Sequence, residues 1–272
     1  MQNLDVYRMN GLGNEFLIID RRKKFISLEK EQIISLSLKN ESKFDQLIFI
    51  EKENKDSVPI TIFNADGKEV SACGNGSRCV SFLISKEKNI KSINLMTSER
   101  LLKTEVVSQE KVKINMGKPA FEWNKIPLKE KANTKNISVK VDDEIFSEGF
   151  ALNIGNPHIV FFVEDCFKIN LKKFGPLIEK HNLFPERCNV TFAHTVNRKK
   201  IYVNVWERGA GLTKACGTAA CAAAISGFEK KKTEREVDIV FNEGVLNLKY
   251  DENENVFMEG PVSQIKKINI KI

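Results

Sequence analysis

Short runs of β-branched and aromatic residues recur along the whole chain. They read FLIID at 16–20, QLIFIE at 46–51, PITIF at 59–63, INLMT at 93–97, HIVFFV at 158–163 and VDIVF at 237–241. Runs of about four to eight such residues, bounded by polar and turn-forming residues, are typical of β-strands. The pattern therefore predicts a protein built mostly from strands.

Helical patterns are few, and two of them are amphipathic. One covers about Leu28–Leu38, with Ser27 as the expected N-cap, and its counterpart covers about residues 171–181. We expect Gly175-Pro176 to interrupt the second helix, because proline removes a backbone hydrogen bond.

Two further helices are expected directly after Cys73 and Cys216. The chain there reads GNGSRCVSFLISKEK and GTAACAAAISGFEKKK, which is apolar on several sides and ends in lysines. A helix that is apolar nearly all round is buried, and lysines suit the negative end of a helix dipole. These segments are therefore predicted to be the central helices of the fold.

The chain also repeats itself at an offset of about 143 residues. The matched positions, in the same order in both halves, are Gly13-Asn14 with Gly155-Asn156, Gln46 with Asn189, Asn64 with Glu207, Ala72-Cys73-Gly74 with Ala215-Cys216-Gly217, and Met116 and Pro119 with Met258 and Pro261. Ordered matches of this kind indicate duplication. We predict an α+β fold of two pseudo-symmetric domains, each a mostly antiparallel β-sheet or barrel wrapped around a central helix, with the active site in the cleft between them.

The repeat also predicts where the domains divide. The N-terminal half covers residues 1–117 and carries Cys73, and the C-terminal half covers residues 118–261 and carries Cys216. The last strand, at about 262–272, is expected to pack back onto the first half.

Composition narrows the functional classes. The chain has 272 residues, of which 42% are hydrophobic, and no apolar run approaches the roughly 20 residues of a membrane span. The N-terminus, MQNLDVYRMN, does not resemble a secretory signal, so a cytoplasmic protein is expected. The net charge of +7 is spread among Lys, Glu and Asn, which favours a solvated surface over nucleic-acid binding.

Six cysteines occur, at positions 73, 79, 166, 188, 216 and 221, with no CxxC spacing and only three histidines. This pattern favours reduced thiols over disulfides, and it argues against a metal site. Cys79, Cys166, Cys188 and Cys221 are interpreted as small buried hydrophobes.

The other two cysteines occupy matched places at the start of a helix. Backbone N–H groups are unpaired there and the helix dipole is positive, so an anion is stabilised. That anion is either a catalytic thiolate or a substrate carboxylate. The residues of the two helix starts that can hold it are Gly74, Asn75, Gly76, Gly217 and Thr218.

Three long segments resemble the signatures of diaminopimelate epimerase. They are FNADGKEVSACGNGSRC at 63–79, NIGNPHIVFFVED at 153–165 and VWERGAGLTKACGTAACAAA at 205–224. The likeness extends from GLGNEF near the N-terminus to MEGPV near the C-terminus, so it covers essentially the whole chain. It implies an isomerase without pyridoxal phosphate, metal or other cofactor, which converts LL- to meso-2,6-diaminopimelate for lysine and peptidoglycan precursor biosynthesis.

The resemblance also implies the roles of individual residues. Cys73 and Cys216 would be the catalytic pair, one a thiolate base and the other a thiol acid. The substrate-binding residues carried over by motif are Asn14, Gln46, Asn64, Gly74, Asn75, Asn156, Asn189, Glu207, Arg208, Gly217 and Thr218. Arg208 suits the distal carboxylate. His158 and Glu207 are candidates for tuning a cysteine, although a satisfied core histidine is an equal alternative.

The sequence departs from the family pattern at several positions. Asn10 stands where histidine is usual, Leu212 where glutamate is frequent and Ala219 where glycine is frequent. Ser42-Lys43-Phe44 replaces a glycine-rich lead, which leaves the placement of Gln46 open.

Two alternative functions remain at this point. One is a cofactor-independent racemase for another amino acid, such as proline or hydroxyproline. The other is an amino-acid-binding or nucleic-acid-binding protein with structural cysteines. Arg208 and the asparagines favour a small substrate that is charged at both ends, with no nucleic acid and no membrane as partner. The oligomeric state stays open, and a homodimer is one expectation.

Overall fold

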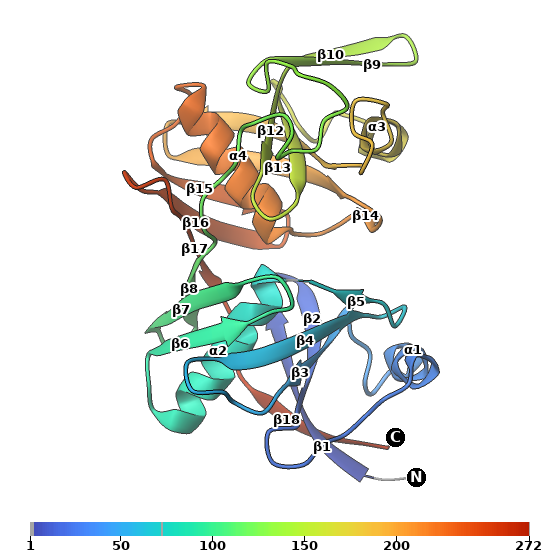
Figure 1. Cartoon of the computed structure of the whole chain (residues 1–272), viewed down its shortest axis with the longest axis vertical. Coiled ribbons are helices and arrows are strands. Elements are labelled where there is room, and N and C mark those ends of the chain that lie inside the picture. The colour runs from blue at the N-terminus through green and yellow to red at the C-terminus, as the bar shows by residue number, and fades with distance from the viewer. Residues whose placement is uncertain (1–2, 72, 272) are drawn as a thin grey trace. The chain divides into compact units, whose positions relative to one another are not determined.

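The computed structural model describes residues 3–71 and 73–271, which form two compact units. The first unit comprises the described residues of Met1–Asn115 and Glu259–Ile272, and the second comprises Met116–Met258 (Figure 1).

The first unit is a mixed sheet with two helices. Its elements are β1 (Asn3–Gly11), β2 (Asn14–Asp20), α1 (Lys30–Leu38), β3 (Gln46–Ile50), β4 (Val58–Asn64), β5 (Glu69–Val70), α2 (Gly74–Lys88), β6 (Ser92–Met96), β7 (Leu101–Ser108), β8 (Lys111–Asn115) and β18 (Lys266–Lys271). Strands β2 and β3 are parallel, as are β4 and β6, and the other printed pairs are antiparallel. The C-terminal strand β18 pairs along β1.

The second unit has the same plan. Its elements are β9 (Ile137–Val141), β10 (Glu144–Asn153), β11 (Pro157–Phe162), α3 (Leu171–Glu179), β12 (Asn189–Asn197), β13 (Lys200–Glu207), β14 (Gly211–Leu212), α4 (Gly217–Glu229), β15 (Glu236–Phe241) and β16 (Gly244–Tyr250). Strand β17 (Val256–Pro261) leads out of this unit into the first. Strands β11 and β12 are parallel, as are β13 and β15.

Positions that match in the sequence repeat also occupy equivalent places in the paired strands of the two units. Phe16 of β2 faces Gln46 of β3, and at the matching place His158 of β11 faces Asn189 of β12. An antiparallel strand follows in each unit and ends at Asn64 or at Glu207. The α+β fold class and the predominance of strands predicted from the sequence are therefore confirmed.

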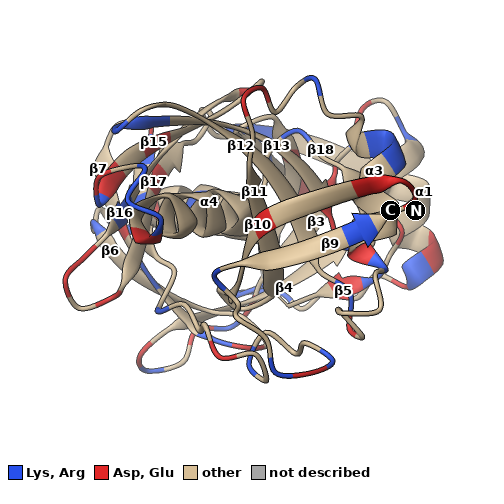
Figure 2. Cartoon of the chain, turned by 90° about the horizontal axis from the view of Figure 1, so that it is seen from above, with Lys and Arg blue, Asp and Glu red and all other residues tan. Residues whose placement is uncertain are grey.

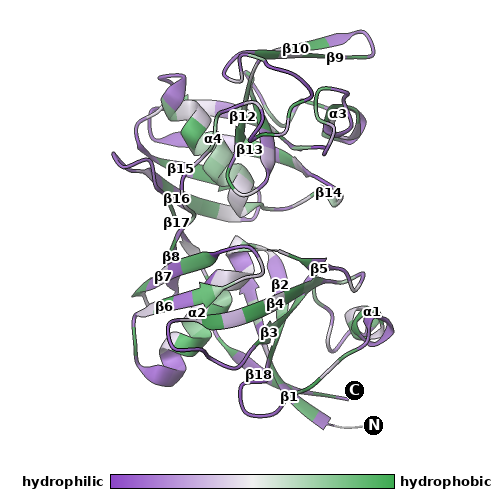
Figure 3. Ribbon diagram, in the orientation of Figure 1, coloured by the Kyte–Doolittle hydropathy of each residue, from purple (hydrophilic) through white to green (hydrophobic). Residues whose placement is uncertain are grey.

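Each unit surrounds one buried helix, as predicted. Every residue from Asn75 to Ser85 of α2 is buried, and so are nearly all residues of α4. Figure 2 shows α4 enclosed by strands, and Figure 3 shows hydrophobic residues on α4 and on the strands around it. Burial of apolar surface on all sides holds each helix in one position, and with it the residue where the helix begins.

A hydrophobic core cluster lies under each peripheral helix. In the first unit Ile33 and Leu36 of α1 pack against the sheet. In the second unit Ile178 of α3 packs with Phe161 and Phe192, whose rings stack at 5.4 Å between centroids. The peripheral helices are thus fixed to the outer face of their sheets.

Two details of the predicted helices are wrong. Ser27 is not the N-cap of α1, because Glu29 is the cap and Gln32 Oε1 accepts a hydrogen bond from the Glu29 backbone N–H at 2.8 Å. Gly175-Pro176 does not interrupt α3, which continues through Pro176 to Glu179. Proline removes only its own N–H, and the bond from Lys180 N to the Pro176 carbonyl, at 3.3 Å, is still made.

None of the helices in residues 3–71 and 73–271 is long and apolar enough to cross a membrane.

Gly149 lies at the irregularity of β10, where a side chain has no room. A Cβ atom there would stand 2.6 Å from a Phe161 ring carbon and 3.1 Å from the Ile137 carbonyl oxygen. We expect Gly149→Ala to lower the free energy of unfolding by about 1–3 kcal/mol through overpacking. Urea denaturation measures this, with the exposed neighbour substitution Ser147→Ala as control. Equal midpoints for the two variants would contradict the packing described.

Candidate active site

Cys73 is the N-cap of α2. Its backbone is extended, with φ −146° and ψ 110°, and its Sγ accepts a hydrogen bond from the Gly76 N–H at 3.3 Å. Its carbonyl accepts the Ser77 N–H at 2.9 Å. The thiol is partly exposed. A sulfur that accepts an N–H bond at the positive end of a helix is well placed to carry negative charge.

The predicted polar residues of the first unit gather at the same end of the sheet. Asn14 and Gln46 begin the parallel strands β2 and β3, and Asn64 ends the antiparallel strand β4. Gln46 Nε2 donates to Asn64 Oδ1 at 2.9 Å, and Asn75 Nδ2 in the first turn of α2 donates to Asn14 Oδ1 at 2.7 Å. Gln46, whose placement the sequence left open, therefore lies in this polar group.

Cys216 is the N-cap of α4 and stands at the matching place in the second unit. Its backbone is also extended, with φ −135° and ψ 118°, and its carbonyl accepts the Ala220 N–H at 3.0 Å. Its Sγ lies 3.4 Å from the Thr218 hydroxyl oxygen. Unlike Cys73, this residue is only 6% exposed. Burial raises the pKa of the Cys216 thiol well above its ordinary value, and the nearby Glu207 carboxylate adds to that effect.

Glu207 is the partner that the fold brings to Cys216. Burial raises the pKa of the Glu207 carboxyl group, and hydrogen bonds from Thr213 and Cys216 partly oppose this. The Thr213 hydroxyl donates to Glu207 Oε1 at 2.5 Å. Thr213 was not identified from the sequence, although its position between Glu207 and Cys216 in the motif was a usable signal. The two halves of the repeat therefore hold their cysteines in different electrostatic surroundings.

Arg208 and Asn189 are tied together by backbone contacts. The Arg208 N–H donates to Asn189 Oδ1 at 3.0 Å, and Asn189 Nδ2 donates to the Pro157 carbonyl at 2.9 Å. Arg208 Nη1 donates to the Glu186 carbonyl at 3.1 Å. Asn189 is buried, so in this structure its amide holds the chain around Arg208.

His158 is fully buried on β11. Its Nε2 lies 2.8 Å from Asn156 Oδ1, and its Nδ1 has no hydrogen-bond partner among the described residues. Burial, followed by the positive charge of Arg208, lowers the pKa of His158 to about 3. The imidazole is therefore neutral at pH 7. Because it faces an amide oxygen, Nε2 is the nitrogen that carries the proton.

The remaining cysteines lie in the interior. Burial raises the pKa of Cys79 and of Cys166 to about 12 and that of Cys188 well above its ordinary value. These thiols stay neutral, which agrees with their interpretation as small apolar residues. Arg78, beside Cys79, has a completely buried side chain and was not singled out from the sequence. Its positive charge lowers the pKa of Cys79, which partly opposes the effect of burial.

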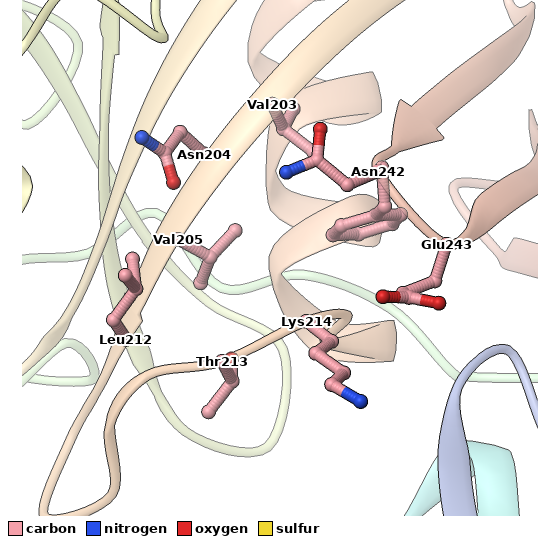
Figure 4. Close-up of a pocket in the computed structure, with 9 residues that line it drawn as sticks. Val203, Asn204, Val205, Leu212, Thr213, Lys214, Asn242 and Glu243 are labelled. Atoms are coloured by element: carbon pink, nitrogen blue, oxygen red, sulfur yellow. The ribbon is translucent and has the colours of Figure 1, made fainter.

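A pocket in the second unit lies beside β13 rather than at Cys216. Figure 4 shows its lining, which consists of Val203, Asn204, Val205, Leu212, Thr213, Lys214, Phe241, Asn242 and Glu243. Thr213 lines this pocket and also donates a hydrogen bond to Glu207. None of the predicted substrate-binding residues lines it. Within the described chain, no group of three or more His, Cys, Asp and Glu residues is arranged to hold a metal ion.

Comparisons with known proteins show the family of this chain. The family model for diaminopimelate epimerase matches residues 6–122 and 150–265. A diaminopimelate epimerase from Pelagibacter ubique is 45% identical over 99% of this chain and 100% of its own length, and one from Brucella anthropi is 37% identical over 93% of this chain and 87% of its own.

Solved structures share the fold at low identity. A phenazine biosynthesis PhzF-family protein from Enterococcus faecalis is 12% identical, with a TM-score of 0.71 and 100% of both chains covered. A probable proline racemase from Agrobacterium radiobacter is 11% identical, with a TM-score of 0.67 over 99% of this chain and 93% of its own. At such identity the likeness extends to the fold alone.

The low pKa of His158 makes stability depend on pH. A histidine takes up a proton in the unfolded chain near pH 6.5, whereas folded His158 resists protonation down to about pH 3. Its contribution is therefore fully present above about pH 6.5 and is lost as the pH falls. Between pH 7 and pH 5 we expect a loss of about 2 kcal/mol.

The substitution His158→Gln should remove that part of the pH dependence. Urea midpoints at pH 7 and pH 5 measure it, and His194→Gln, at a part-exposed position of β12, is the control. If wild type and His158→Gln lost the same free energy of unfolding between these two pH values, the buried neutral histidine would be disproved.

Proposed function

The chain belongs to the diaminopimelate epimerase family, and on that basis we propose that this isomerase converts LL- to meso-2,6-diaminopimelate by moving one α-proton between two cysteines. The observation that carries the proposal is the paired placement of the thiols. Each is the N-cap of the buried central helix of an equivalent unit. We further propose that the reaction serves lysine and peptidoglycan precursor biosynthesis. A cytoplasmic location follows, since thiol catalysis needs reduced cysteines.

Inversion at a carbon atom needs two groups. A single base that removes the α-proton returns it to the face it came from, whereas a base on one face and an acid on the other invert the centre. We propose that Cys73 and Cys216 act on opposite faces of one α-carbon. In the LL-to-meso direction the Cys73 thiolate takes the α-proton and becomes a thiol. The Cys216 thiol then protonates the other face and becomes the thiolate.

The roles follow from the different surroundings of the two sulfurs. Cys73 is partly exposed and accepts an N–H bond, which suits the anion. Cys216 is buried beside the Glu207 carboxylate, which raises its pKa and suits the thiol. The protonation states are exchanged after one turnover, so the reverse reaction uses the same pair with the roles reversed. A further forward turnover requires protons to exchange with solvent.

The carbanion-like transition state needs stabilisation, because an amino-acid α-proton is very weakly acidic. The N–H groups in the first turns of α2 and α4 are aimed outward from the helix ends, where they can hold the α-carboxylate as charge develops on it. The groups concerned belong to Gly74, Asn75, Gly217 and Thr218. We propose that these fixed dipoles do the work that a cofactor does in other epimerases.

Recognition of diaminopimelate is assigned to the polar residues around the helix starts. Arg208 is proposed to bind the distal carboxylate, with Asn14, Asn64 and Asn156 binding the amino and carboxylate groups. Gln46 is held to Asn64, and Asn189 holds the backbone of Arg208, so both order the residues that touch substrate. Neutral His158 orders Asn156 in the same way.

The two-thiol mechanism is tested with LL-diaminopimelate in D₂O without added cofactor. Chiral analysis and mass spectrometry of the wild-type reaction should find the meso isomer with one deuterium on carbon. Cys73→Ala and Cys216→Ala should each bind substrate but lower kcat by at least about 10²-fold, because each removes a general acid or base. Cys166→Ala, at a buried cysteine outside the site, should retain turnover. Full turnover by either of the first two variants would refute the mechanism.

The distal carboxylate assignment is tested with Arg208→Met. Loss of hydrogen bonds from a cation is expected to raise KM for diaminopimelate by about 10- to 100-fold. A panel of amino acids, scored for loss of α-tritium to water, checks the substrate class. Exchange with proline but not with diaminopimelate would replace this proposal with a proline racemase.

A further inference from the structure

Glu207 is the last residue of β13, and Arg208 follows it in the turn to β14. At the matching positions the first unit has the uncharged residues Asn64 and Ala65. The backbone of the β13–β14 turn reverses direction within a few residues, with Gly209 and Gly211 both at positive φ, and Ala210 N donates to the Glu207 carbonyl at 3.1 Å. Outside the turn, the Glu186 carbonyl accepts a hydrogen bond from Arg208 Nη1 at 3.1 Å. For the guanidinium to keep one position, the turn that carries it also needs support from the rest of the unit.

That support comes from Glu179, the last residue of α3. Its side chain is buried, and each of its oxygens accepts a hydrogen bond from the β13–β14 segment. Oε2 accepts the Trp206 indole N–H at 2.7 Å, and Oε1 accepts the Gly209 backbone N–H at 3.1 Å. Arg187 Nη1 lies 3.7 Å from Oε1 as a partly exposed counter-charge. Burying a carboxylate costs free energy unless it is paired and hydrogen-bonded. The two N–H donors and the arginine offset that cost for Glu179.

The two donors stand on either side of Arg208 in the chain. Trp206 precedes it by two residues and Gly209 follows it directly, so the carboxylate binds the Trp206 indole on one side of Arg208 and the Gly209 backbone on the other. Asn189 Oδ1 and the Glu186 carbonyl bind Arg208 itself. We propose that Glu179 is a positioning residue that fixes the Trp206–Gly209 turn and so sets the site for the distal carboxylate. This rests on the proposed role of Arg208.

The indole ring of Trp206 packs closely against Gly175 of α3. A Cβ atom on Gly175, one turn earlier in α3, would lie 2.5 Å from a carbon of the Trp206 ring. The ring therefore lies directly against the helix backbone, and its N–H is directed to the carboxylate at the end of the same helix.

The internal repeat provides a comparison for this interaction. Near the end of α1, the first unit has Ser37, whose hydroxyl donates to the Ile34 carbonyl at 2.8 Å and lies 3.2 Å from the Ala65 carbonyl oxygen. Ala65 follows Asn64 as Arg208 follows Glu207, so both units tie the peripheral helix to the same turn. Only the unit with an arginine in the turn uses a carboxylate that binds two donors. The pair of hydrogen bonds to Glu179 thus occurs in the unit whose turn carries a long, charged side chain. Such a side chain loses more conformational entropy when it is held in one position.

The test compares Glu179→Gln, Trp206→Phe and the double variant in steady-state kinetics. In Glu179→Gln the remaining side-chain oxygen still accepts a hydrogen bond from one of the two N–H donors. The new amide NH₂ faces the other donor and cannot accept a hydrogen bond from it. We expect KM for diaminopimelate to rise about tenfold, with kcat within about threefold of wild type. Trp206→Phe should raise KM several-fold. In the double variant no indole donor opposes the amide, so KM should be about that of Trp206→Phe alone rather than the product of the two effects.

Two further measurements separate positioning from general stability. Glu144→Gln makes the same charge change at an exposed site in β10 and should leave KM and kcat unchanged. With ¹⁵N-labelled tryptophan, the indole N–H signal of Trp206 should move in Glu179→Gln while that of Trp123 stays. A merely structural role would lower the melting temperature or the active fraction and leave KM unchanged.

The outcomes distinguish this inference from the proposed function. If Arg208→Met raises KM but Glu179→Gln and Trp206→Phe do not, the positioning role is overturned and the recognition of diaminopimelate stands. If Arg208→Met itself leaves KM unchanged, the role of Arg208 fails first. If Glu179→Gln does not fold, Trp206→Phe decides alone, and an unchanged KM in that variant overturns the inference.

Discussion

The proposed chemistry of this protein depends on one constraint, which is the unpaired backbone at the start of a buried helix. Its first N–H groups have no partner within the helix, so the beginning is a place of positive potential inside an otherwise apolar core. Cys73 and Cys216 occupy that place as N-caps of α2 and α4. The strands hold the helices, and the helices hold the thiols, so core packing positions the two sulfur atoms to which we assign the proton transfer.

The two units share this backbone arrangement but differ in the charge of the residues around their cysteines. Gln46 corresponds to Asn189 and Asn64 to Glu207, and the register of the strands is equivalent. Cys73 Sγ accepts a hydrogen bond from the Gly76 N–H, whereas Cys216 is buried beside the Glu207 carboxylate, which raises the pKa of its thiol. The two matched thiols therefore lie in different electrostatic surroundings.

Three buried residues lie behind the proposed site. Asn189, His158 and Glu179 each hold another residue of the second unit in place through a part-buried hydrogen bond. Such bonds are costly to leave unmade in a low-dielectric interior, so each one fixes a specific geometry. The residues proposed to bind substrate are therefore ordered by the residues packed behind them.

The sequence by itself determined the strand content, the repeat, the two central helices and the cysteine at the start of each, because periodicity and local capping are properties of neighbouring residues. Two predictions from the sequence were wrong. Ser27 is not the N-cap of α1, since Glu29, two residues on, forms a capping box with Gln32. Pro176 does not end α3, since one missing hydrogen bond is not enough to end the helix. Only the tertiary structure decided that Glu179 reaches Trp206 and Gly209, and that burial sets the pKa of His158 and Cys216 apart from their ordinary values. Those contacts join residues distant in the chain, and desolvation depends on everything packed around a group, so neither can be derived from local pattern.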